Sequence, residues 1–201
     1  MMIRVLDILI SFFGLIILTP IFIIISFLIT FESKGGVFYL QVRVGKNGND
    51  FKLFKFRTMV KNSEQQGSLT VGFRDKRITR IGFFLRRYKL DELPQLINVL
   101  IGNMSMVGPR PEIRKYVDLY NPEQRAVLKI KPGVTDAASI KYSDENALLG
   151  RSENPEQTYI EEIMPAKLKL NLIYVRNQSV NQYLSIIIIT IAHIFKIYRI
   201  P

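Results

Sequence analysis

The chain has 201 residues, of which 48% are hydrophobic, and its 28 Lys and Arg against 17 Asp and Glu give a formal net charge of +11. This length accommodates one domain and a membrane element, and the charge favours anionic partners such as lipid phosphates, nucleotides or nucleic acid. The absence of cysteine excludes disulfides and thiolate chemistry, and a single histidine, His193, excludes a histidine-based metal cluster. Zinc chemistry and a Ser-His-Asp triad are therefore disfavoured.

The N-terminal segment from Ile8 to Phe31 contains no charged side chain and predicts a membrane helix. It is longer than the roughly 20 apolar residues that a helix needs to cross about 30 Å of hydrocarbon. A cleaved signal peptide is disfavoured, because the apolar run is too long and no small-residue cleavage site follows it. Pro20, preceded by Thr19, lacks the amide hydrogen of a helical residue and predicts a bend in this helix.

The bend leaves two topologies open, a kinked single pass and a re-entrant helix that returns to the side it came from. Lys34, Arg43 and Lys46 mark the downstream flank as cytoplasmic, whereas upstream Arg4 is offset by Asp7. By these charges alone the single pass is slightly favoured.

The next segment predicts a β-hairpin. Residues 37–44 and 51–57 are rich in β-forming side chains and flank Asn47-Gly48, a strong hairpin-turn signal. Residues 63–72 are polar, contain glycine and show no apolar periodicity, so we expect a surface loop that could close over a ligand.

Further helices are expected in the second half of the chain. Apolar residues over 93–101 predict a short helix that ends at Gly102, and residues 122–130 and 166–177 also have helical character. The apolar segment 184–195 is too short to span a bilayer and predicts an interfacial or core helix, in which His193 is a packed or interfacial residue rather than a catalyst.

Asp91 and Glu92 are adjacent carboxylates at the expected start of the helix over 93–101, with Asp91 at the N-cap position and Pro94 in the first turn. A helix N-terminus favours an ionised carboxylate and attracts phosphate. Two adjacent acids with oxygen ligands alone favour magnesium, which also uses substrate phosphates. Taken without context, however, the pair is more simply explained as a helix cap and a first-turn acid.

Basic side chains surround this pair in the sequence. Those that can balance the charge of a diphosphate are Arg86, Arg87, Lys89 and Arg110, the last held in a rigid Pro-Arg-Pro turn. Lys52, Lys55 and Arg57 alternate with apolar residues, a pattern that is typical of a solvated strand face and also compatible with a phosphate-binding surface.

Taken together, these features resemble the bacterial sugar transferases known as small monotopic phosphoglycosyl transferases. The resemblance covers nearly the whole chain and begins with the apolar helix and its central proline. It continues with QVRVG at 41–45, FKFRTM at 54–59, RITRIG at 77–82, LDELPQL at 90–96 and VGPRP at 107–111. Six matches in this order are highly specific, and they favour a catalytic role for the acidic pair over a helix cap.

The resemblance implies an α+β fold with an N-terminal re-entrant helix broken at Pro20, a small β-hairpin and a helical catalytic domain with interfacial amphipathic helices. Residues 1–33 would form the membrane element, with the bend at Thr19 and Pro20, and residues 34–201 a catalytic domain at the cytoplasmic face of the bacterial inner membrane. It thereby favours the re-entrant topology over the single pass.

The resemblance also implies an activity, the transfer of a phospho-sugar from a UDP-sugar to undecaprenyl phosphate. This step initiates a surface glycan such as an exopolysaccharide, a capsule, an O-antigen or a glycoprotein glycan. Asp91 would be the nucleophile and release UMP, and Glu92, with Asp91, would hold Mg²⁺. The expected phosphate- and nucleotide-binding residues are Lys55, Arg57, Arg80, Arg87 and Arg110.

The partners implied are the UDP-sugar, undecaprenyl phosphate and membrane lipid, without nucleic acid, and a homo-oligomer is compatible with the family. Two departures from the family pattern, Asp136-Ala137-Ala138-Ser139 and Tyr183, are expected to bear on sugar or nucleotide specificity. The alternatives from other classes are a non-catalytic protein whose basic face binds anionic lipid and, more remotely, a nucleic-acid-binding protein.

Overall fold

The computed structural model describes residues 1–61 and 75–198, so the loop predicted over 63–72 lies outside the described residues. The helices are α1 (Met2–Glu32), α2 (Arg80–Arg87), α3 (Gln95–Ile101), α4 (Arg114–Val117), α5 (Ala137–Lys141), α6 (Glu145–Leu149), α7 (Pro155–Thr158), α8 (Met164–Arg176) and α9 (Val180–Tyr198). The strands are β1 (Phe38–Val44), β2 (Asp50–Phe56), β3 (Ser105–Val107) and β4 (Gly133–Thr135). Three 3₁₀ turns, η1 (Lys46–Gly48), η3 (Leu90–Glu92) and η4 (Gln124–Lys129), and a π-helical turn, η5 (Tyr159–Ile163), complete this mixture of helix and strand.

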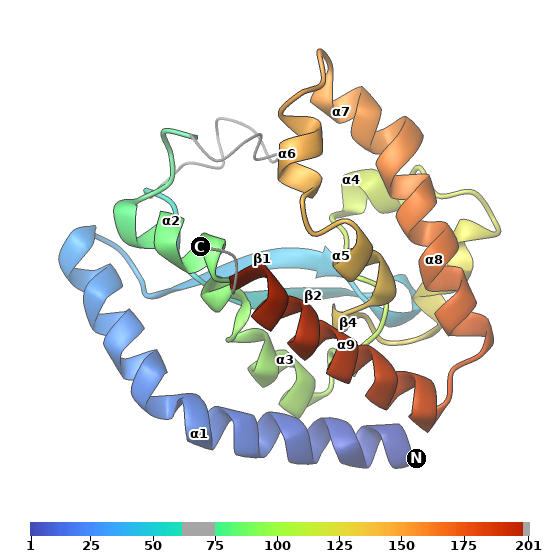
Figure 1. Ribbon diagram of the computed structural model, residues 1–201, viewed down its shortest axis with the longest axis horizontal. Coiled ribbons are helices and arrows are strands. Elements are labelled where there is room, and N and C mark those ends of the chain that lie inside the picture. The colour runs from blue at the N-terminus through green and yellow to red at the C-terminus, as the bar shows by residue number, and fades with distance from the viewer. Residues whose placement is uncertain (62–74, 199–201) are drawn as a thin grey trace.

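Helix α1 continues through Pro20 without interruption and changes direction along its length (Figure 1). The prediction of a broken helix is therefore wrong, whereas the bend is present. The hydroxyl of Thr19 donates to the carbonyl oxygen of Leu15 at 2.8 Å, a back-bond that bends helices without ending them. In the part of the chain that the structure describes, α1 is the one helix that is long and apolar enough to cross a membrane.

Both ends of α1 are attached to the remainder of the chain. Near its start, the guanidinium of Arg4 donates to the carbonyl oxygens of Val99 and Leu100 at 2.6 and 2.9 Å, in the last turn of α3. At its other end, the carboxylate of Glu32 accepts the first two backbone N–H groups of α2, those of Arg80 at 2.7 Å and of the next residue at 3.0 Å. Each end thus satisfies polar groups at a helix terminus of the same domain.

A buried carboxylate anchors the first turns of α1. Asp7 is 2% exposed, and its Oδ1 atom accepts hydrogen bonds from the hydroxyl of Ser105 at 2.9 Å, the N–H of Met106 at 2.8 Å and the hydroxyl of Tyr183 at 2.8 Å. A buried charge is tolerated when such donors surround it. Asp7 therefore joins α1 to β3 and to α9.

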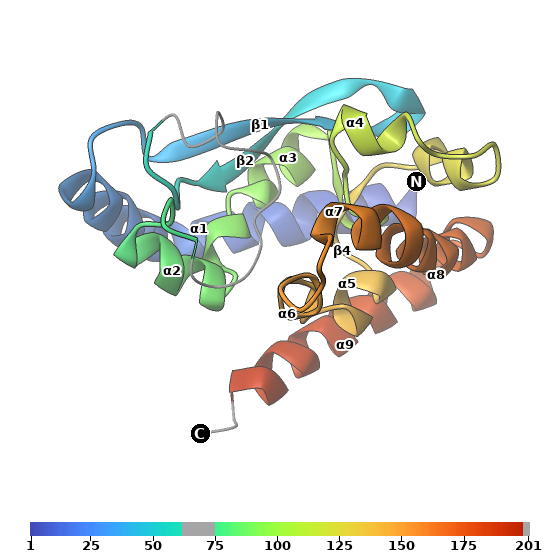
Figure 2. The same cartoon turned by 90° about the horizontal axis from the view of Figure 1, so that it is seen from above.

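The predicted hairpin is confirmed. Strands β1 and β2 pair in antiparallel register, and the turn between them places Asn47 at φ 59° and Gly48 at φ 78°, the left-handed conformation that these two residue types accept. One face of the hairpin is buried, with Leu53 packed against Val99 of α3 and Met104 after it. The hairpin thereby lies directly over α3 (Figure 2).

A second, two-stranded sheet was not predicted. Strands β3 and β4 are parallel, with Ser105 opposite Gly133 and Val107 opposite Thr135. Here two glycines are needed because the backbones touch: a Cβ atom on Gly133 would lie 2.1 Å from the backbone nitrogen of Gly108. The Pro-Arg-Pro turn begins directly after this contact.

The C-terminal helices follow the predicted order. The segments predicted over 166–177 and 184–195 form most of α8 and α9, whereas the segment over 122–130 forms the 3₁₀ turn η4. Figure 2 shows the β1–β2 hairpin on one side of the molecule and α9 on the other, with α3 and α1 between them. Helix α9 keeps exposed apolar residues, among them Ile188 and Ile191, and its His193 is half-buried, as predicted for a packed or interfacial side chain.

Candidate active site

The acidic pair lies in the turn η3, not at the N-cap of α3 as predicted. Helix α3 begins at Gln95, with Pro94 as its N-cap and without a side-chain cap. The chain turns because Lys89 adopts a left-handed conformation, φ 56° and ψ 18°, and the N–H of Glu92 then bonds to the carbonyl of Lys89 at 3.3 Å. The N–H of Leu93 likewise bonds to the carbonyl of Leu90 at 3.3 Å, so these two backbone donors do not use the carboxylate of Asp91.

Glu92 is clamped by two cations. Its Oε1 atom lies 3.1 Å from Nζ of Lys55 and 2.5 Å from Nη2 of Arg110, and its Oε2 atom lies 3.3 Å from Nη1 of the same arginine. Burial alone would raise the pKa of Glu92, but Arg110 and Lys55 together hold this pKa well below its usual range. Glu92 is therefore ionised at neutral pH, and in turn it raises the pKa of Arg110.

Asp91 has a different environment although it is the adjacent residue. It is 7% exposed, and no described residue donates a hydrogen bond to its carboxylate. Burial and the negative charge of Glu92 raise the pKa of Asp91, an effect that Lys55 and Arg86 partly oppose. Two acids in neighbouring positions thus have opposite pKa shifts, because only one of them is hydrogen-bonded to cations.

Arg86, one of the residues expected to balance the charge of a diphosphate, lies beside Asp91. Its Nε atom donates to the hydroxyl of Thr58 at 2.8 Å, and burial lowers its pKa while Asp91 opposes that shift. The sequence does not distinguish Arg86 from the basic residues around it. Gly82, four residues earlier on the same face of α2, lets this face approach Thr58, because a Cβ atom there would lie 2.0 Å from the carbonyl oxygen of Thr58.

The other three predicted phosphate-binding residues are not among the described side chains that donate to Glu92. The guanidinium of Arg57 donates to the carbonyl oxygens of Ser33 and Lys34 at 2.8 and 2.6 Å, where it closes the end of α1. Arg80 is the exposed first residue of α2, and Arg87 has its guanidinium 5.9 Å from the ring centre of Tyr88. The structure therefore brings Lys55 and Arg110 to the acidic pair, and phosphate binding by the other three stays a prediction.

The acidic pair is compatible with Mg²⁺, although the described residues contain no group of three or more His, Cys, Asp or Glu side chains that could hold a metal ion. Magnesium typically uses one or two carboxylates, several waters and the phosphates of its substrate, so a complete protein cage is not needed. Asp91 has both oxygens unbonded within the described residues, whereas Glu92 already has its oxygens on two cations. Asp91 is thus the better placed ligand of the two.

Comparison with known proteins places the chain in one family. The model of the bacterial sugar transferase family matches residues 1–197. A UDP-N-acetylgalactosamine-undecaprenyl-phosphate N-acetylgalactosaminephosphotransferase of Aeromonas hydrophila is 40% identical over 69% of this chain and 34% of its own length. A UDP-glucose:undecaprenyl-phosphate glucose-1-phosphate transferase of Klebsiella pneumoniae is 35% identical over 94% of this chain and 39% of its own length.

A shorter relative is similar over nearly its whole length. The exopolysaccharide production protein PSS of Rhizobium leguminosarum bv. phaseoli is 36% identical over 94% of this chain and 92% of its own length. The chain thus spans between a third and two fifths of the Aeromonas and Klebsiella proteins but nearly all of the Rhizobium one. It belongs to the bacterial sugar transferase family.

Proposed function

We propose that this protein is a phosphoglycosyl transferase that moves a phospho-sugar from a UDP-sugar to undecaprenyl phosphate. The observation that carries the proposal is the asymmetry of the acidic pair, in which Asp91 is buried without a hydrogen-bond donor among the described residues while Glu92 is clamped by Lys55 and Arg110. An unbonded carboxylate beside cations is suited to attack phosphorus. The relatives that are named as undecaprenyl-phosphate sugar phosphotransferases support the same reaction.

The reaction would proceed in two displacements. In the first, an oxygen of Asp91 forms a bond to the phosphorus that bears the sugar, and the bond from this phosphorus to the UMP oxygen breaks. In the second, an oxygen of undecaprenyl phosphate attacks the same phosphorus, and the bond to Asp91 breaks and restores the carboxylate. Splitting one transfer into two steps lets each substrate meet the same nucleophile in turn.

The surrounding side chains would supply charge and position. Arg86 lies beside Asp91 and would lessen repulsion between this carboxylate and a diphosphate, and Arg110, fixed on Glu92, would face the phosphoryl oxygens. Mg²⁺ held by Asp91 and Glu92 would neutralise charge on the donor diphosphate.

We further propose that α1 is re-entrant and that the domain lies at the cytoplasmic face of the inner membrane. Arg4 and Glu32, at opposite ends of α1, both bond to the same domain, which is difficult to reconcile with ends on opposite sides of a bilayer. A reporter fused before Met1 should be cytoplasmic, whereas labelling of that end from outside the cell would support the single-pass topology. Replacing Pro20 by alanine should favour the straight, spanning form.

The activity is tested by incubating the purified protein with Mg²⁺, undecaprenyl phosphate and a panel of UDP-sugars while UMP release is measured. We expect release with at least one sugar, and a covalent adduct with the mass of that phospho-sugar when undecaprenyl phosphate is omitted. A panel without UMP release would favour the rival function, a non-catalytic protein that binds anionic lipid through its basic surface.

A further inference from the structure

A partly buried carboxylate, that of Glu112, lies near Arg110 and has no part in the reaction proposed above. Glu112 follows Arg110 by two residues, and its Oε1 atom accepts the hydroxyl of Tyr159 at 2.5 Å. Its Oε2 atom lies 3.4 Å from Nη1 of Arg43, and its backbone oxygen accepts the N–H of Val44 at 2.8 Å. The carboxylate is thus held from two elements that are distant in the sequence.

Arg43 extends this support to the backbone of the Pro-Arg-Pro turn. Its Nη1 atom also donates to the carbonyl oxygen of Pro111 at 3.1 Å, and its Nε and Nη2 atoms donate to the side-chain oxygen of Gln41 at 3.0 and 2.8 Å. The side chains of Arg43 and Glu112 are 17% and 13% exposed, so solvent screens this pair little. The end of the turn is therefore tied to strand β1.

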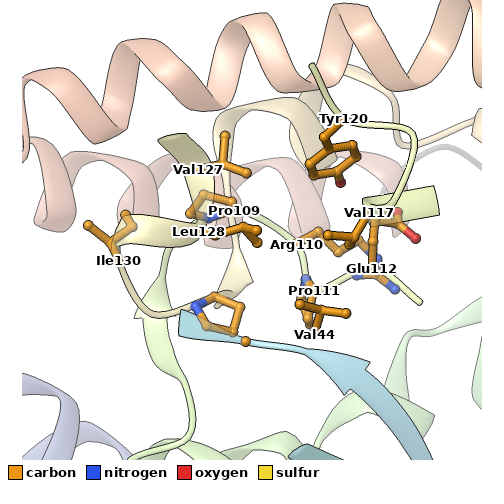
Figure 3. Close-up of a pocket in the computed structure, with 12 residues that line it drawn as sticks. Val44, Pro109, Arg110, Pro111, Glu112, Val117, Tyr120, Val127, Leu128 and Ile130 are labelled. Carbon is orange, nitrogen blue, oxygen red and sulfur yellow. The ribbon is translucent and has the colours of Figure 1, made fainter. Parts of the chain in front are cut away.

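The start of the turn is tied to the other sheet. The carbonyl oxygen of Pro109 accepts the N–H of Gly133 at 3.0 Å, and the N–H of Gly108 donates to the carbonyl of Thr135 at 3.1 Å. Arg110 lies between these two attachments, and the proline on each side restricts the backbone. A cavity beside the turn measures about 10 Å³, at most the space of one water, so there is little room for the turn to relax (Figure 3).

We propose that Glu112 and Arg43 are positioning residues for the transfer reaction and act through Arg110. They hold the turn in the position from which the guanidinium of Arg110 reaches both oxygens of Glu92. The alternative is a merely structural ion pair, which would stabilise the domain without affecting the transfer step. The inference rests on the proposed phosphoglycosyl transfer, because its readout is the rate of that reaction.

The test compares Glu112→Gln with Glu123→Gln, a matched control whose carboxylate forms an exposed ion pair with Arg176. Loss of a buried supporting contact typically costs 10- to 100-fold in activity, so we expect kcat for UMP release to fall by about that factor in Glu112→Gln. The KM for the UDP-sugar should change by less than about threefold, since the loss concerns the transition state. The control should keep the wild-type rate.

A double-mutant cycle with Arg110→Lys separates positioning from stability. If Glu112 acts through Arg110, adding Glu112→Gln to Arg110→Lys should cost less than about twofold further in kcat, because the shared interaction is already lost. The inference would be overturned if Glu112→Gln lowered kcat by the same factor in the wild type and in Arg110→Lys, or if Glu112→Gln alone were fully active.

A milder variant covers the case in which Glu112→Gln does not fold. Tyr159→Phe removes one hydroxyl from Glu112 and leaves the ring in place. We expect the unfolding midpoint to fall by only about a few degrees, and kcat per folded molecule to fall by about threefold or more. Full activity of a folded Tyr159→Phe would then contradict the inference. Wild-type protein without UMP release would contradict the proposed function itself and the inference with it, whereas an active wild type with fully active variants contradicts the inference alone.

Discussion

Two of the three buried aspartates among the described residues, Asp7 and Asp91, have opposite surroundings. Asp7, where α1 meets β3 and α9, is 2% exposed and accepts three hydrogen bonds, whereas Asp91 in η3 is 7% exposed and accepts none from the described residues. A buried carboxylate is costly unless donors surround it. The first aspartate is therefore part of the framework, whereas the carboxylate of the second is left open to other contacts within the described residues.

The same comparison explains why burial alone is a poor guide to chemistry. Asp7 has the lower exposure, yet its contacts with Ser105 and Tyr183 leave its Oδ1 atom fully engaged. Asp91 is paired with a neighbour, Glu92, that takes the hydrogen bonds of Lys55 and Arg110 for itself. The number of donors around a carboxylate, rather than its depth, separates the two roles.

The largest expected effect is that of Asp91→Asn on activity. The variant lacks the proposed nucleophile, so UMP release should fall by at least about 10³-fold and the phospho-sugar adduct should disappear from the intact mass spectrum. Because a buried negative charge beside Glu92 is removed, the unfolding midpoint should stay the same or rise by a few degrees. Asp118→Asn, at an exposed aspartate, is the control. Full activity of Asp91→Asn would show that another group attacks the phosphorus.

Glu92→Gln should lower both activity and stability. Arg110 and Lys55 lose their shared anion, and removing one partner of a partly buried ion pair costs about 2–3 kcal/mol. UMP release should fall nearly as far as in Asp91→Asn, but with a lower unfolding midpoint, measured by thermal denaturation of both variants. Equal midpoints for the two variants would mean that the two carboxylates are not as different as their contacts indicate.

Asp7→Ala should show the reverse pattern, a loss of stability without a loss of chemistry. The hydroxyls of Ser105 and Tyr183 and the N–H of Met106 are left without an acceptor, at a cost of about 3 kcal/mol, or roughly 6–12 °C in the unfolding midpoint. The rate per folded molecule below that midpoint should remain within about threefold of the wild type. A loss as large as that of Asp91→Asn would place Asp7 in the catalytic machinery.

The smallest effect is expected for Tyr183→Phe. One of the three donors to Asp7 is removed while the buried ring remains, so the stability should fall by about 1–2 kcal/mol. Thermal denaturation of Tyr183→Phe and Asp7→Ala side by side measures how much of the stability lost in Asp7→Ala depends on this hydroxyl. A change in the range of UDP-sugars that the variant accepts would support the sequence-based expectation that Tyr183 bears on the sugar or nucleotide, over a purely structural role.

Much of the site could be predicted because its signals are local. The turn at Asn47-Gly48 determines the register of the hairpin and thus the strand position of Lys55, and two prolines restrict the chain around Arg110. The prediction of Asp91 as an N-cap was wrong. The left-handed conformation of Lys89 places the turn η3 before the helix, and no pattern in the sequence indicates this conformation.

Other residues were assigned incompletely because their partners lie far away in the chain. Arg57 resembles a phosphate ligand in an alternating basic strand, yet it bonds to the carbonyls of Ser33 and Lys34. Arg86 bonds to Thr58, 28 positions away, where Gly82 lies against the backbone of Thr58 just after β2, and the sequence does not indicate this contact.

The sequence by itself determined the apolar helix, the hairpin, the acidic pair and the cations available to it, because each depends on residue type and short-range spacing. Tertiary structure alone decided which acid is hydrogen-bonded and which is left open. Asp7 meets Tyr183 across 176 positions, and Lys55 and Arg110 reach Glu92 across 37 and 18. Such contacts depend on how α1, β2 and α9 pack, and packing sums many weak long-range interactions that no local pattern records.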